Sequence, residues 1–195
     1  MSLMSLLLLS AGPLFAPDVN DDKDILNARP HTCVTPRVTI ETSTDGKQLR
    51  VFDNATKKLI EASRVTDAQQ SPQTISLLLH AVPRQSCIAI LTSGKEVWEI
   101  SYAEGREPVY QAMVHDYQMQ EGVKDRRQYA PRITLLEQRF SQFYFDREFR
   151  TFIVYDGQQR WQLINLDIRR KMFDISVGQG WKIDEMGAAF SLTTK

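Results

Sequence analysis

The stretch SCIAILTSGKEVWEISYAEGREPVYQAMV, residues 86–114, decides the fold class. In its second segment apolar residues alternate with polar ones, and Trp98 and Ile100 fall on one face. A two-residue period is typical of a strand with two different faces. The pair Ser93-Gly94 before that segment supplies the positive φ that a tight hairpin requires. The stretch therefore predicts strand, glycine turn, strand, polar turn and strand.

The same unit occurs twice more, as VTIETSTDGKQLRVFDNATKKLIEASRV (38–65) and FRTFIVYDGQQRWQLINLDIRRKMFDISV (149–177). Gly46 and Gly157 occupy the corresponding turns, so the three turn glycines lie 48 and then 63 residues apart. A period of about 40–50 residues with three or four antiparallel strands is typical of a propeller blade. The innermost strand should precede each unit.

These repeats predict an all-β chain that folds as a partial β-propeller of about three antiparallel blades. The propeller region spans 37–180, with blades at about 38–65, 74–114 and 133–177. An ordinary β-sandwich also has short strands at regular spacing and is the competing fold. We favour blades because the order of strands and turns repeats.

The apolar run LLLLSAGPLFA, residues 6–16, is shorter than the roughly 20 residues that a membrane-spanning helix needs. It fits the core of a secretory leader, so we predict a leader over 1–16 and no membrane span. A disordered apolar tail, or a start codon inside a longer gene, is the alternative. A polar linker over 17–36 and a C-terminal tail over 181–195 complete the predicted organisation. The leader points to a periplasmic or secreted protein.

The chain has 195 residues, with 24 basic and 24 acidic side chains. A zero net charge argues against a dedicated nucleic-acid binder. Cys33 and Cys87 are too few for a zinc-finger cluster, and we favour two buried thiols. One disulfide is the alternative in an oxidising compartment. The sequence has no HExxH, GxGxxG or GxSxG motif, so we predict neither a metal site nor catalytic residues.

Three runs resemble the haem d1 propeller domain of dissimilatory cytochrome nitrite reductase and its relatives. The run KEVWEISYAEGREPVYQAMVHDYQMQEG (95–122) carries the resemblance, 143–175 is similar to the next blade, and 74–91 to the preceding strand pair. The partial and divergent match covers 73–175. It implies an eight-bladed propeller with haem d1 across its funnel, and a periplasmic setting.

The sequence departs from this family where the reductases place two histidines above the haem. The corresponding positions read FYFD (143–146) and VGQG (177–180), and neither contains histidine. No CxxCH is present for a haem c. Nitrite reduction needs proton donors beside the substrate and an electron path, so we expect no nitrite reductase activity.

We expect instead a haem d1-related protein that binds or matures a tetrapyrrole in a denitrification-type context. The alternative is a cofactor-free partial propeller that acts as a protein interaction module, or a degenerate gene fragment. No metal-ligand constellation supports a propeller hydrolase or lactonase. Eight blades need roughly 320–400 residues, so we expect self-association, a partner that completes the propeller, or an unusually curled open sheet.

His115, Arg132 and Tyr144 are the candidate cofactor-binding residues. His115 precedes Asp116 and has the chemistry of an axial ligand or acid–base group. Arg132 would clamp a haem carboxylate, and Tyr144 would donate a hydrogen bond into the funnel. The alternatives are a surface-loop histidine, a solvated arginine and a tyrosine packed between inner strands.

Overall fold

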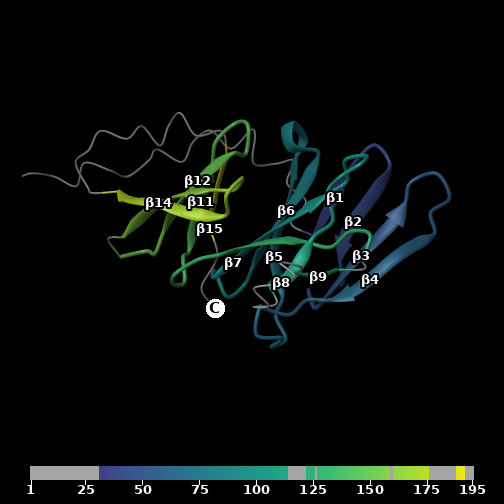
Figure 1. Ribbon diagram of the computed structural model, residues 1–195, viewed down its shortest axis with the longest axis horizontal. Helices are drawn as coiled ribbons and strands as arrows, with labels where there is room; N and C mark the ends of the chain where they lie inside the picture. Colours follow the sequence, from purple (N-terminus) through teal and green to yellow (C-terminus); the bar gives the residue numbers. More distant parts are fainter. Residues whose placement is uncertain (1–30, 114–121, 126, 159, 176–187, 192–195) are drawn as a thin grey trace, which may run out of the picture.

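The computed structural model describes residues 31–113, 122–125, 127–158, 160–175 and 188–191. These residues form three antiparallel sheets that stand side by side, and one separate hairpin (Figure 1). The predicted all-β partial propeller is confirmed, and the described residues contain no α-helix. The predicted leader, 1–16, lies outside the described residues.

The first sheet is a simple meander, whereas the second and third sheets each include one strand that is not consecutive along the chain with its partner. The first contains, in order, β1 (Thr32–Val34), β2 (Val38–Thr42), β3 (Gln48–Asp53) and β4 (Leu59–Arg64). The second contains β5 (Ile75–Ala81), β6 (Ser86–Leu91), β7 (Glu96–Ser101) and β10 (Arg132–Leu135), and a 3-10 turn, η2 (Val82–Arg84), joins β5 to β6. The third contains β11 (Gln142–Phe145), β12 (Thr151–Tyr155), β13 (Trp161–Asn165) and β14 (Arg170–Ile175), with β15 (Ala188–Ser191) added beside β11.

The second sheet is the centre of the stack because both of its faces are buried. All six residues of β6 are buried, which an alternating strand achieves only between two apolar layers. Ala89 and Leu91 belong to the core shared with the first sheet. Ile88 and Ile90 belong to the core shared with the third sheet, which is rich in phenylalanine. Face-to-face packing of successive sheets is the arrangement expected of propeller blades.

The three predicted glycine turns have the predicted backbone conformation. Gly46, Gly94 and Gly157 have φ of +69°, +63° and +89°. Two of the turns contact the chain at the entry to the next sheet: the Ile75 N–H donates to the Gly46 carbonyl at 3.1 Å, and the Phe140 N–H to the Gly94 carbonyl at 2.9 Å. Each of these turns therefore also positions the following blade.

A disulfide joins Cys33 on β1 to Cys87 on β6, so the favoured prediction of two thiols is wrong. The Cα atoms lie 6.2 Å apart, within the range that a disulfide spans. Both residues belong to the core between the first two sheets, where β1 contacts β5. The bond therefore links neighbouring blades across their shared core.

Three strand positions differ from those predicted. β1 falls inside the predicted linker 17–36, and β15 inside the predicted tail 181–195, because backbone pairing with β2 and β11 recruits short segments. The outer strand of the second sheet is β10, whereas the predicted blade 74–114 ended with the segment that forms β8.

Candidate functional site

The second sheet carries an insertion between its third and fourth strands. The chain leaves β7, forms a hairpin of β8 (Tyr110–Met113) and β9 (Gly122–Lys124), and returns as β10. The Asp125 N–H donates to the Val109 carbonyl at 2.8 Å, which closes the base of the hairpin. Binding residues are often carried by such additions to a rigid scaffold. The insertion is therefore a candidate location for a binding site.

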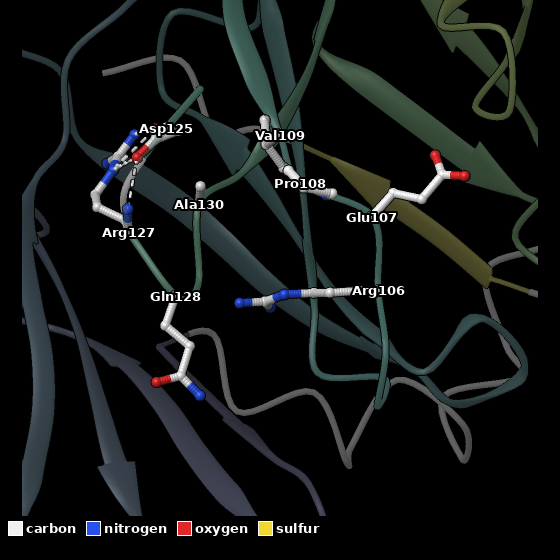
Figure 2. Close-up of a pocket in the computed structure, with 8 residues that line it drawn as sticks. All are labelled: Arg106, Glu107, Pro108, Val109, Asp125, Arg127, Gln128 and Ala130. Carbon is white, nitrogen blue, oxygen red and sulfur yellow. Dashed lines mark hydrogen bonds and ion pairs between the residues drawn. The ribbon is translucent and has the colours of Figure 1, made fainter. Parts of the chain in front are cut away.

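A pocket of about 470 Å³ lies at the base of this hairpin (Figure 2). Its walls come from the two chain segments that flank the hairpin. The lining residues are Arg106, Glu107, Pro108, Val109, Asp125, Arg127, Gln128 and Ala130. The pocket therefore combines two guanidinium groups, two carboxylates and an apolar wall.

Arg106 enters the pocket from the loop after β7 and extends toward Gln128 (Figure 2). The central carbon of its guanidinium lies 4.8 Å from the centre of the Tyr129 ring, in cation–π geometry. Its Nη1 donates to the carbonyl of Ser101. Burial lowers the pKa of Arg106. Within the described part of the chain, Arg106 forms no salt bridge.

Arg127 occupies the opposite wall and is neutralised locally. Its guanidinium donates to both carboxylate oxygens of Asp125, with Nη2 2.6 Å from Oδ2. The hydrogen bond to Asp125 raises the pKa of Arg127. The side chain of Glu107 points away from Arg106 (Figure 2). Arg106 is therefore the pocket cation that forms no salt bridge among the described residues, although the charge of Glu61 acts on it.

None of the three predicted cofactor-binding residues lines this pocket in the described part of the chain. His115 lies outside the described residues. Tyr144, on β11, is 9% exposed, and its hydroxyl donates to Oε1 of Gln142 at 2.6 Å. Its ring centre lies 5.7 Å from that of Trp161, and burial raises the pKa of Tyr144. These contacts are those of a packed aromatic side chain.

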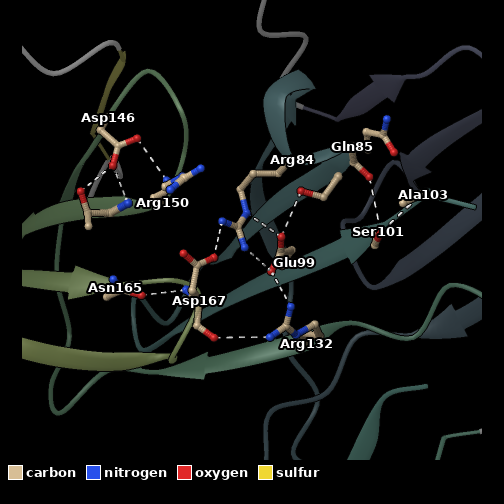
Figure 3. A network of polar contacts seen from close by, with 12 residues as sticks. Arg84, Gln85, Glu99, Ser101, Ala103, Arg132, Asp146, Arg150, Asn165 and Asp167 are labelled. Carbon is tan, nitrogen blue, oxygen red and sulfur yellow. Dashed lines mark hydrogen bonds and ion pairs between the residues drawn. The ribbon is translucent and has the colours of Figure 1, made fainter. Parts of the chain in front are cut away.

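Arg132, on β10, belongs to a polar network between the second and third sheets (Figure 3). Its Nη1 lies 3.7 Å from Oε2 of Glu99, and its Nη2 donates to the Asp167 carbonyl at 3.5 Å. Arg84 donates to Glu99 and to Asp167, at 2.7 Å in each case. Among the described residues, Arg132 and Tyr144 share no contact partner, and neither lines the pocket.

The described histidines make hydrogen bonds within the fold. His31 Nδ1 lies 3.1 Å from the Thr42 hydroxyl, and His80 Nε2 lies 2.8 Å from the Tyr102 hydroxyl. In the part of the chain that the structure describes, no three His, Cys, Asp or Glu side chains are grouped to hold a metal ion. The same residues contain no helix that is long and apolar enough to cross a bilayer.

Sequence reasoning missed Arg106. It lies directly after Glu104-Gly105, which the sequence presents as an ordinary polar turn. The available signal was the 63-residue spacing of the turn glycines, which places extra chain in this region. The spacing does not indicate which arginine of the region lacks a carboxylate partner, because ion pairing depends on the hairpin geometry.

The sequence matches no protein-family model and no curated protein. Among solved structures, the chain is similar to dihydro-heme d1 dehydrogenase NirN in complex with DHE, with a TM-score of 0.53 and 20% identity. The match covers 73% of this chain and 26% of NirN, so the chain spans about a quarter of that protein. At this identity the likeness shows the fold: the stacked sheets form a partial β-propeller.

A second similar structure is the β-propeller domain of Myceliophteria thermophila Cps50 (Swd1). It matches with a TM-score of 0.46 and 9% identity, over 75% of this chain and 42% of that one.

Proposed function

We propose that this protein is an exported partial propeller that binds or matures a tetrapyrrole of the haem d1 type and does not reduce nitrite. The observation that carries the proposal is the position of the resemblance in the fold. Residues 73–175 hold the sequence resemblance, and they contain the two sheets that stack through the phenylalanine-rich core. The likeness to NirN, solved in complex with DHE, adds support from the fold.

Export is supported by the disulfide together with the predicted leader. Disulfides persist in oxidising compartments and are rare in the cytosol. Cys33 and Cys87 are both buried in the core, so their bond belongs to the folded structure. We therefore place the protein in the periplasm or outside the cell.

The residues around the pocket fit one part of a tetrapyrrole. A carboxylate of the macrocycle would pair with Arg106, while Pro108, Val109 and Ala130 supply apolar surface. The lining contains no His, Cys, Met or Tyr, so these residues offer no ligand of the kind that usually holds a haem iron. A bound haem d1 would bring its own iron and redox chemistry, and this chain would recognise and orient its acidic edge.

An absorbance titration tests the proposal. The purified full chain is titrated with haem d1 at neutral pH, and the chain unfolded in urea serves as the control. We expect a saturable shift of the Soret band with the folded chain alone. We also expect no consumption of nitrite by the reduced complex. A spectrum identical to that of free haem d1 at every protein concentration would overturn the proposal.

A second function, a protein interaction module, is favoured by apolar side chains on the outer strands. Leu59 and Ile60 on β4 are 53% and 41% exposed, and Met172 on β14 is 49% exposed. Outer strands present unpaired backbone edges, which readily pair with another chain.

Light scattering after size exclusion tests this second function and should give a mass above that of one chain. Replacement of Leu59 and Met172 by serine should restore the monomer mass, and a wild-type monomer would contradict self-association.

A further inference from the structure

The pocket arginine Arg106 has partners of a different kind from those of the arginines that form salt bridges. Arg127 pairs with Asp125, Arg84 and Arg132 with Glu99, and Arg37 with Glu104. Among the described residues, Arg106 donates to a backbone carbonyl and stacks on a ring, with no carboxylate in salt-bridge range. The charge of Glu61 acts on Arg106 without forming a salt bridge with it. A partly buried cation without a directly bound counter-ion is costly, and an anion that enters the pocket would offset this cost.

The guanidinium of Arg106 is held in place before any ligand arrives. Tyr129 lies beneath it and is only 8% exposed. The Tyr129 N–H donates to Glu61 on β4 at 3.2 Å, so the aromatic support is tied to the first sheet. Because the guanidinium has five N–H donors and Ser101 accepts from one nitrogen, other donors remain for a ligand. Preorganisation of this kind lowers the entropy cost of binding.

The rest of the pocket is compatible with a carboxylate on a flat apolar body. Asp125 is engaged by Arg127, and Glu107 points away from Arg106 (Figure 2). Pro108, Val109 and Ala130 form a wall without charge. We infer that Arg106 is the anchor for a carboxylate of a small-molecule ligand in this pocket, and, resting on the proposed function, for a carboxylate on the edge of a tetrapyrrole.

Two metal-free porphyrin probes test this inference on the full chain. The first is coproporphyrin III, which carries four carboxylates, and the second is its tetramethyl ester. Fluorescence titration of the oxidised protein measures both affinities. We expect the ester to bind at least about tenfold more weakly, because it cannot form the charge-assisted pair with the guanidinium.

Variants of Arg106 assign the effect to the pocket. Arg106→Ala should weaken binding of the acid about tenfold to a hundredfold and leave binding of the ester unchanged. Arg106→Lys keeps the positive charge but lacks the planar guanidinium. Its affinity for the acid should therefore lie between that of the wild type and that of Arg106→Ala. Arg147→Ala, at an exposed position on the turn before β12, is the matched control and should bind like the wild type. Thermal unfolding of each variant verifies that it is folded.

The outcomes separate this inference from the proposed function. Equal affinities for acid and ester, or an acid affinity unchanged in folded Arg106→Ala, would overturn the carboxylate anchor even if haem d1 binds. Failure of the acid to bind at all would overturn it as well. Loss of both haem d1 binding and porphyrin binding would reject the two proposals together. Weaker acid binding in Arg106→Ala alone, with the ester unaffected, supports the anchor.

Discussion

Among the described turn glycines, Gly94 leaves the least room for a side chain. It has φ of +63° in the turn between β6 and β7, and an added Cβ would lie 2.2 Å from the Phe140 carbonyl oxygen. Gly105 has a similar φ of +65°, but nothing lies within 4 Å of an added Cβ. Gly105→Ala therefore reports the conformational cost alone, about 1 kcal/mol, and is the matched control.

We expect Gly94→Ala to lower the free energy of unfolding by at least about 2 kcal/mol more than Gly105→Ala, because backbone atoms must move to relieve the clash. Urea denaturation of both variants measures the difference. Equal losses would show that the turn does not dock closely against the entry to the third sheet.

His80 should make stability depend on pH near neutrality. Burial lowers the pKa of His80 below the ordinary histidine value of about 6.5. As pH falls below that value, the unfolded chain takes up the proton before the folded one does, so stability decreases until the folded pKa is passed. The lowered pKa values of Asp45, Asp53 and Glu137 act at more acid pH.

Urea denaturation at pH 7.5 and at pH 5.5 measures this dependence. We expect the wild type to be less stable at pH 5.5 than at pH 7.5. His80→Gln keeps a hydrogen-bonding side chain for Tyr102, and its free energy of unfolding should decrease less between the two pH values. An identical pH dependence in the variant would contradict the assignment to His80.

At the scale of elements, Arg84 connects η2 to β7 and to the turn between β13 and β14. Its side chain is 11% exposed and Glu99 is 6% exposed, whereas the side chains of the Arg37–Glu104 pair are 65% and 82% exposed. Removing one partner of a buried pair leaves an uncompensated charge, while an exposed pair contributes less than about 1 kcal/mol.

We expect Arg84→Met to destabilise the protein by about 2 kcal/mol, since Arg132 stays near Glu99. Arg37→Met should have almost no effect. The difference is measured by thermal or urea unfolding, and similar losses in both variants would rule out a special role for the network that joins the second and third sheets.

Elements were predictable from the sequence where the signal is local. The glycine turns and the buried face with Trp98 and Ile100 follow from neighbouring residues. β1, β10 and β15 were missed or misplaced because short strands depend on distant partners for their backbone hydrogen bonds. Of the predicted cofactor-binding residues, Arg132 contacts Glu99 and Tyr144 contacts Gln142, both away from the pocket. The type of a side chain does not by itself reveal such contacts.

At the scale of the whole molecule, the disulfide restrains the first sheet relative to the second. Cys33 and Cys87 are 54 residues apart, and closing a loop of that size in the unfolded chain corresponds to roughly 4 kcal/mol in the chain-entropy treatment. We expect the double variant Cys33→Ala, Cys87→Ala to have its unfolding midpoint at a lower urea concentration than the oxidised wild type. Two titratable thiols in the purified wild type, or equal midpoints, would contradict this expectation.

Hydrogen exchange followed by mass spectrometry tests most directly whether these sheets form one self-supporting partial propeller. Central strands with a neighbour on each side exchange slowly when their sheet is stably packed. We predict strong protection of β2, β3, β6, β7, β12 and β13, and faster exchange in the outer strands β4 and β14. Fast exchange throughout, or protection confined to one sheet, would contradict the stacked partial propeller.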